Sequence, residues 1–83
     1  MDIILNKGRV LIRLDEDENK EGLILNEDKN YYEGEVILIN SEVNFTKVGA
    51  KAIFPKTSLR TVLSEEGKRY AILLDEEVLA SYV

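Results

Sequence analysis

The chain has 83 residues, of which 45% are hydrophobic and 33% are charged, and its formal net charge is −5. This size and composition predict one small globular domain, residues 1–83, with a modest core and no separate catalytic domain. The absence of cysteine excludes disulfides and thiolate zinc sites, and the absence of histidine removes the most frequent metal ligand and general base.

Charge and hydropathy also argue against several partners. An acidic chain without a basic stripe repels a phosphate backbone, so no nucleic-acid partner is expected. The uncharged apolar runs are too short to span a bilayer, and no N-terminal stretch has the pattern of a secretion signal. We therefore expect a cytoplasmic protein that neither inserts into a membrane nor carries a cofactor.

Apolar segments of strand length follow one another along the chain and are separated by turn residues. They are residues 9–14, 34–40, 50–55, 59–64 and 69–74. In the first segment Val10, Ile12 and Leu14 fall on one face, as in a half-buried strand. Glycines lie between the segments, where chain reversals often need a positive φ: Gly8, Gly34, Gly49 and Gly67. This pattern predicts an all-β protein, a small barrel or sandwich.

The last section of the chain, "LDEEVLASYV", has two interpretations. Asp75 can cap a short helix whose first turn holds Glu76 and Glu77. The ending "VLASYV", residues 78–83, equally suits a strand.

A calcium loop is one interpretation of the acidic run that begins at Asp15. Asp15, Asp17 and Asn19 match the first three ligand positions of an EF-hand. The sixth position, which requires glycine, is Lys20, and the twelfth, which requires glutamate, is Asn26. The match therefore fails at both positions that close such a loop, and a solvated acidic loop is the simpler interpretation.

The apolar tetrapeptide "GLIL" interrupts this charged run. One interpretation is a short strand that belongs to the core. Its flanks, residues 15–21 and 26–29, are nearly all charged and offer no alternating face, which favours a flexible arm that folds as it docks into a hydrophobic groove of a partner. In that case Gly22 is the hinge of the arm.

Five stretches in this order resemble the GroES family, the co-chaperonins known as chaperonin-10. "MDIILNKGRVLIR" aligns without a gap on the start of the family, and "EGLIL" resembles its mobile-loop motif. "GEVILI" is similar to the strand after that loop, and "KVGAKAIFPKTS" to the family's Val-Gly-x-x-Val-x-Phe segment. "RYAILLDEEVLASYV" resembles its closing section of strand, acidic turn and last strand. The resemblance covers nearly the whole chain.

The resemblance implies a small irregular GroES-like β-barrel that assembles into a heptameric ring. Such a ring caps a GroEL-type chaperonin, which binds the nucleotide, and assists ATP-dependent protein folding. A mobile loop of about residues 15–33 binds the chaperonin, which assigns that role to Gly22, Leu23, Ile24 and Leu25. No glycine loop that cradles phosphate is present, in keeping with nucleotide binding by the partner.

In the family, the first strand of one subunit pairs with the last strand of its neighbour. The corresponding residues here are Ile3, Ile4, Leu5, Val78, Leu79, Ala80, Tyr82 and Val83. Exposed terminal edge strands associate readily, and head-to-tail pairing around a closed ring leaves none of them open. The alternative for these residues is ordinary packing within one barrel.

The chain departs from the family between residues 40 and 46, where a longer hairpin usually forms the roof of the ring. Phe45 in this shortened connection either faces a neighbouring subunit or folds back on the barrel. A GroES-fold structural or phage-associated ring without chaperonin binding is the alternative function. Zinc-dependent dehydrogenases with GroES-like domains need cysteine or histidine ligands, so we predict no enzyme, no catalytic residue and no metal site.

Overall fold

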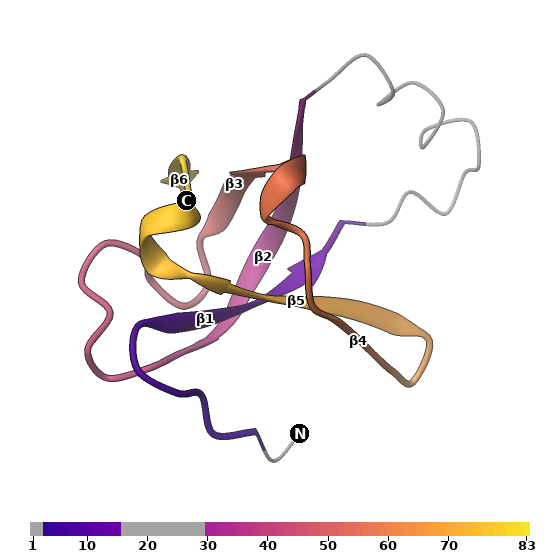
Figure 1. Ribbon diagram of the computed structural model, residues 1–83, viewed down its shortest axis with the longest axis horizontal. Helices are drawn as coiled ribbons and strands as arrows, with labels where there is room; N and C mark the ends of the chain where they lie inside the picture. The colour runs from indigo at the N-terminus through magenta and orange to yellow at the C-terminus, as the bar shows by residue number, and fades with distance from the viewer. Residues whose placement is uncertain (1–2, 16–29) are drawn as a thin grey trace.

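A computed structural model describes residues 3–15 and 30–83, and these residues form one antiparallel sheet of six strands (Figure 1). The strands are β1 (Arg9–Leu14), β2 (Tyr31–Ile39), β3 (Lys51–Pro55), β4 (Val62–Glu65), β5 (Lys68–Leu74) and β6 (Ala80–Tyr82). Two single-turn 3₁₀ helices connect them, η2 (Lys56–Ser58) and η3 (Asp75–Glu77). The predicted all-β class is therefore confirmed.

The strand order is β4-β5-β1-β2-β3-β6, so the chain crosses the sheet twice, from β3 to β4 and from β5 to β6. β5 pairs with β1, whereas η3 leads the chain across to β6, which pairs with β3 (Figure 1). This crossover folds the sheet around a core. The two outer strands, β4 and β6, do not pair with each other, so the sheet does not close into the expected barrel in the part of the chain that the structure describes.

The main core lies on one face of the sheet and uses alternate residues of its central strands. Ile12 pairs with Val36 on one side and with Ala71 on the other, and all three are fully buried. Phe54 is the largest fully buried side chain. The core consists of Val10, Ile12, Val36, Val43, Ala52, Phe54, Ala71, Leu73 and Val78. Burial of such aliphatic and aromatic side chains is the dominant stabilising contribution to the fold.

The opposite face of β1 is also partly apolar. Leu11 is fully buried but does not belong to the main core, and it pairs with Leu38 and Ile72. The alternation in β1 therefore separates two apolar layers, and only Arg9 and Arg13 keep the second face partly solvated.

Two strand boundaries, the starts of β2 and β4, differ from the sequence predictions by three residues. β2 begins at Tyr31, so residues 31–33, which the sequence analysis placed in the loop, belong to the sheet. Tyr32 pairs with Phe54, with 6.1 Å between the ring centroids, and this cross-strand contact extends β2 toward the charged run. β4 begins only at Val62, and residues 59–61, between η2 and β4, have no regular structure.

Gly34 has a different role from the one that its position in the sequence suggested. Gly8, Gly49 and Gly67 have a positive φ, as predicted for turn glycines, but Gly34 does not and lies within β2. A Cβ atom there would lie 2.4 Å from the Arg13 carbonyl oxygen and 2.5 Å from Ile12 Cγ2. Gly34 is therefore required by the close approach of β1 and β2.

The C-terminal section contains both predicted alternatives in succession. Asp75–Glu77 forms the 3₁₀ helix η3, in which Asp75 is the first residue and Leu74 occupies the cap position. The chain then extends through Val78 into β6. The helix is one turn long because Val78, at its C-terminal end, is extended and buried in the core.

Candidate functional site

The last strand, β6, is an edge strand with apolar side chains on its surface. Its inner edge pairs with β3 from Lys51↔Tyr82 to Ile53↔Ala80, and the Leu79 N–H donates to the Ile53 carbonyl at 2.7 Å. No strand within residues 3–15 and 30–83 pairs with its outer edge. A short edge strand with unpaired backbone groups is a site at which another chain can add a strand.

The predicted interface residues of this section divide into one buried and several exposed side chains. Val78 is buried in the main core, so it stabilises the subunit itself. Leu79 is 62% exposed, Tyr82 is 49% exposed and Val83 is fully exposed, and Ala80 is also exposed. Exposed large apolar side chains next to a free sheet edge fit the interface interpretation better than packing within one barrel.

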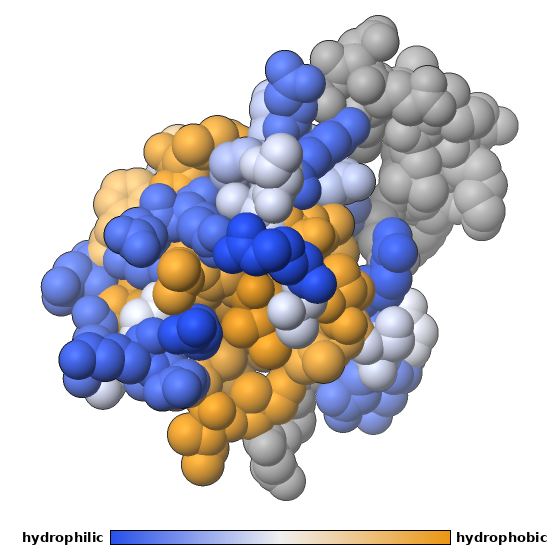
Figure 2. Space-filling model, in the orientation of Figure 1, coloured by the Kyte–Doolittle hydropathy of each residue, from blue (hydrophilic) through white to orange (hydrophobic). Residues whose placement is uncertain are grey.

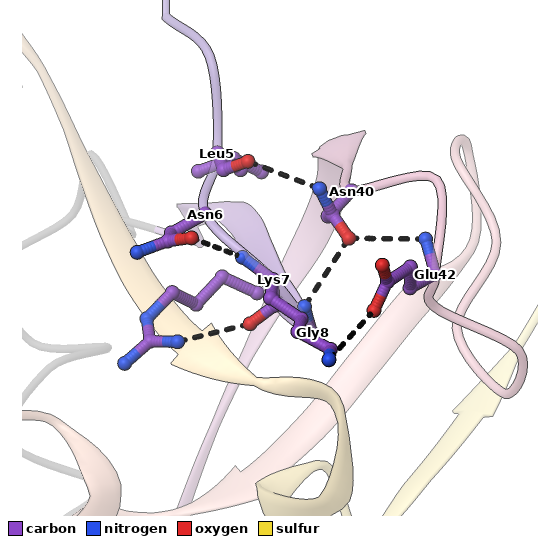
Figure 3. A network of polar contacts seen from close by, with 7 residues as sticks. Leu5, Asn6, Lys7, Gly8, Asn40 and Glu42 are labelled. Atoms are coloured by element: carbon purple, nitrogen blue, oxygen red, sulfur yellow. Dashed lines mark hydrogen bonds and ion pairs between the residues drawn. The ribbon is translucent and has the colours of Figure 1, made fainter.

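The N-terminal segment runs from Ile3 to Lys7 without regular structure, and Asn40 attaches it to the end of β2 (Figure 3). The Asn40 Nδ2 group donates to the Leu5 carbonyl at 3.1 Å. Its Oδ1 atom accepts from the Gly8 N–H at 3.2 Å and from the Glu42 N–H at 3.0 Å. One side chain therefore fixes the N-terminal segment, the start of β1 and the following loop together.

With the segment attached in this way, the three predicted N-terminal interface residues differ in their exposure. Leu5 is buried, Ile3 is half-buried and Ile4 is 98% exposed. The alternation resembles that of an extended chain, in which successive side chains point in opposite directions. Figure 2 shows apolar side chains that gather on one face and continue toward the N-terminal end of the chain. Ile4 is consequently the residue of this segment that is most available to a partner.

The two ends of the proposed mobile loop lie beside each other at one end of the β1–β2 pair. Leu14 pairs with Gly34, and the Asp15 N–H donates to the Glu33 carbonyl at 3.1 Å. The chain therefore leaves the sheet at Asp15 and returns to it through Asn30 at the same place. The predicted chaperonin-binding residues, Gly22, Leu23, Ile24 and Leu25, lie outside the described residues.

The described residues bear on two features, the cluster of ligating side chains that a metal site requires and the long apolar helix that a helical membrane span requires. Of the calcium-loop positions, Asp15 forms an ion pair with Lys51, and Asp17 and Asn19 lie outside the described residues. Among residues 3–15 and 30–83, no three acidic, histidine or cysteine side chains come close enough to hold a metal ion. The same residues contain no helix with the length and apolar character needed to cross a membrane.

The connection between β2 and β3 folds back on the body of the protein, and Asp75 fixes it there. The Asp75 carboxylate accepts the Phe45 N–H at 3.2 Å, the Thr46 N–H at 3.1 Å and the Thr46 hydroxyl. Thr46 is buried, with 1% of its surface exposed, whereas Phe45 is 50% exposed. The backbone around Phe45 is thus held against η3 while its ring stays on the surface.

Asn40 and Asp75 are the positioning residues that the sequence did not reveal. Asn40 appeared as the last residue of an expected strand, and Asp75 as a possible helix cap. Both residue types readily bond to backbone N–H groups in turns, which is the one signal that the sequence contained. Two of the N–H groups that they reach, those of Gly8 and Thr46, lie about thirty positions away in the sequence.

Replacing Asp75 by alanine is expected to destabilise the subunit by about 2 to 3 kcal/mol, because two donors of the buried Thr46 lose their acceptor. Asp75→Asn keeps one acceptor oxygen and is expected to cost about 1 kcal/mol. Urea denaturation measures both. The control is Glu76→Ala, an exposed neighbour expected to change stability by less than about 0.5 kcal/mol. Equal effects of Asp75→Ala and Glu76→Ala would contradict this role.

Glu77 links η3 to the segment before β4 and gives the stability a pH dependence. Its carboxylate accepts the Leu74 N–H at 3.0 Å and Arg60 Nη2 at 2.6 Å. Partial burial alone raises the pKa of Glu77, but these two hydrogen bonds and the charges of Arg60 and Arg9 outweigh it, so the pKa lies below its ordinary value of 4.5. The stabilisation is therefore present above that value and is lost as the pH falls through the lower pKa of the folded protein.

We expect Glu77→Gln to lower the melting temperature at pH 7 and to have a diminishing effect as the pH falls below about 4.5, where the wild-type carboxylate becomes protonated as well. Thermal denaturation of both proteins between about pH 7 and pH 3 measures this convergence. A difference that stays constant over this range would show that the charge of Glu77 does not contribute.

No protein-family model matches this chain, and no curated protein matches it either.

Proposed function

We propose that this protein is a cytoplasmic co-chaperonin whose subunits assemble head to tail into a ring, and that the ring caps a GroEL-type chaperonin through the segment that contains Gly22 to Leu25. The observation that carries the proposal is that two different surfaces are left without a partner. The outer edge of β6 is unpaired within the described residues, and Ile4 is 98% exposed on a segment that Asn40 holds in place.

These two surfaces lie apart on one subunit. In Figure 1 the C-terminus lies beside β6 and β3, whereas the N-terminal segment extends away below β1. Different surfaces that fit each other form a heterologous contact, which propagates from subunit to subunit and ends only when the chain of subunits closes into a ring. The proposed contact places Ile4 of one subunit against Leu79 and the β6 edge of the next.

The position of Asp15 and Glu33, apart from the two terminal surfaces, also supports assembly into a ring. The Asp15 N–H bonds to the Glu33 carbonyl, so the end of β1 and the start of β2 lie side by side, at the end of the sheet opposite to the β2–β3 connection (Figure 1). A ring built through the terminal segments therefore leaves this end of every subunit available. All arms of the ring would then extend from equivalent positions toward one chaperonin.

The energetics of the arm favour a ring over a monomer. Burial of an aliphatic side chain such as Leu23, Ile24 or Leu25 contributes about 1.5 to 3 kcal/mol, whereas ordering the backbone costs roughly 1 to 2 kcal/mol per residue. One arm alone binds weakly. Linked arms bind at an effective concentration set by their tethers, which raises the overall affinity by a factor of about 10² to 10⁴. Weak arms also dissociate together when the chaperonin changes its nucleotide state.

The experiment that tests this function is native mass spectrometry of the protein alone and then mixed with a GroEL-type chaperonin, with and without nucleotide. We expect a ring of about seven subunits that joins the chaperonin only when nucleotide is present. A ring that never joins would favour the structural ring without chaperonin binding. A monomer would overturn the proposed contact between the terminal segments.

A further inference from the structure

A group of polar side chains connects β6 to the place where residues 16–29 leave and rejoin the sheet. Asp15 follows β1, and Glu33 lies in β2 and accepts the Asp15 N–H through its carbonyl; we call these two residues the loop roots. Lys51 in β3 and Tyr82 in β6 lie directly opposite each other in the β3–β6 register. Asp15, Glu33 and Lys51 alternate along the chain with core residues, so they lie on the face of the sheet that is opposite to the main core. Tyr82 shares this face because it pairs with Lys51.

Two side-chain contacts cross the sheet from these strands to the loop roots. Lys51 Nζ forms an ion pair with Asp15 Oδ2, so β3 is linked to the end of β1 across the intervening strand β2. The Tyr82 hydroxyl donates to Glu33 Oε1 at 3.3 Å, so β6 is linked to β2 across β3. The hydrogen bond with Asp15 is also the largest of the causes that raise the pKa of Lys51 above its ordinary value.

Backbone hydrogen bonds and strand pairing connect the same strands as these side-chain contacts. The Leu79 N–H donates to the Ile53 carbonyl at 2.7 Å, and Ile53 pairs with Glu33. The Glu33 carbonyl in turn accepts the Asp15 N–H at 3.1 Å. Backbone pairing therefore connects Leu79, just before β6, with Asp15 through β3 and β2 without a break.

β6, at the outer end of this series of contacts, is the shortest strand in the sheet and lies at its edge. β6 has three residues and one partner strand within the described residues, so its local opening costs little free energy. A neighbouring chain that pairs with its free edge would hold β6 in place and, with it, the Tyr82 hydroxyl and the β3 side of Lys51. When binding at one site orders part of the protein, a second site that needs the same order loses less entropy on binding, and the two sites are therefore coupled.

We infer that Lys51 and Tyr82 are positioning residues that connect the β6 edge to the loop roots, so that pairing of β6 with a neighbouring subunit orders Asp15 and Glu33. This inference rests on the proposed function: it assigns to ring assembly the additional effect of preparing the chaperonin-binding segment. An arm whose roots are already ordered loses less entropy when it binds, and therefore binds more tightly.

The test uses the assembled protein and compares Lys51→Met with Lys51→Arg, which retains the charge. Lys47→Met is the matched control, because Lys47 is an exposed lysine in the β2–β3 connection, away from the loop roots. Tyr82→Phe removes the second contact and has Tyr70→Phe as its control. The readouts are the ring mass, the hydrogen exchange rate of the Asp15 amide, and the affinity for a GroEL-type chaperonin with nucleotide.

We expect Lys51→Met to leave the ring mass unchanged, to accelerate exchange of the Asp15 amide about 2- to 5-fold and to weaken chaperonin binding by a similar factor per arm, since exposed ion pairs contribute modestly. Lys51→Arg is expected to restore both values. In the ring, Tyr82→Phe is expected to accelerate Asp15 exchange by a comparable factor, whereas Lys47→Met and Tyr70→Phe leave it unchanged.

The outcomes separate this inference from the proposed function. A wild-type protein that forms neither a ring nor a chaperonin complex would overturn the proposed function, and the coupling to assembly with it. A wild-type ring that binds the chaperonin, combined with Asp15 exchange and affinity unchanged in Lys51→Met and Tyr82→Phe, would overturn the inference alone. Faster exchange without weaker binding would show that the contacts only stabilise the sheet, and would overturn their positioning role.

Discussion

Leu25→Asp is expected to abolish capping of the chaperonin and to leave the ring assembled. The variant removes an aliphatic side chain whose burial contributes about 1.5 to 3 kcal/mol per arm, and it places a charge in an apolar groove, which costs more. Because the arms act together, the loss is multiplied over the ring and is expected to exceed about 100-fold in affinity. Native mass spectrometry with chaperonin and nucleotide measures the complex, and the same spectra report the free ring.

Asn26→Asp is the matched control, because it adds the same charge at the adjacent position without removing an aliphatic side chain. It is expected to cap the chaperonin nearly as well as the wild type does. Normal capping by Leu25→Asp would exclude the tetrapeptide as the chaperonin-binding element. Equal loss in both variants would show that added charge, rather than the loss of leucine, prevents binding.

The second prediction concerns assembly: Ile4→Asp is expected to convert the ring into 9.5 kDa monomers that remain folded. Ile4 is 98% exposed, so its replacement removes almost no contact within the subunit. In the proposed contact it would lose about 1.5 to 3 kcal/mol of burial at every interface of the ring and leave a desolvated carboxylate there. Native mass spectrometry measures the assembly, and circular dichroism measures the fold.

Val48→Asp is the control for this variant, because Val48 is also an exposed apolar residue, 58% exposed, but lies in the β2–β3 connection. It is expected to keep the ring. An intact ring in Ile4→Asp would contradict the proposed contact between the N-terminal segment and β6. Leu25→Asp separates binding from assembly, because it is expected to remove capping and to keep the ring. Ile4→Asp is expected to remove both, since one arm alone binds weakly.

Local patterns in the sequence were sufficient for much of the fold. The alternation of Val10 and Ile12 with their neighbours, and the glycines between apolar runs, predicted the strands β1, β3 and β5 nearly to the residue. These signals are reliable because they depend on properties of adjacent residues, namely side-chain direction and allowed φ. The sequence also identified Ile4, Leu79 and Val83 as apolar residues near the chain ends, and these residues are exposed.

Some residues had more than one structural interpretation, and the sequence did not determine which one was correct. Gly34 appeared equivalent to the turn glycines, but it is required by the approach of Arg13 from β1. Tyr31 and Tyr32 appeared to end a loop, but the contact between Tyr32 and Phe54 draws them into β2. Leu5 and Ile4 are adjacent aliphatic residues, yet one is buried and the other is exposed.

Only the tertiary structure decided these points, because each depends on a residue distant in the sequence. Asn40 holds Leu5 and thereby exposes Ile4, Asp75 holds the connection that carries Thr46, and Tyr82 reaches Glu33. A strand pattern specifies which side chains share a face, but it does not specify which strands become neighbours. The sequence by itself therefore determined most of the strands and the apolar character of the two chain ends. Strand pairing decided which side chains at those ends are exposed.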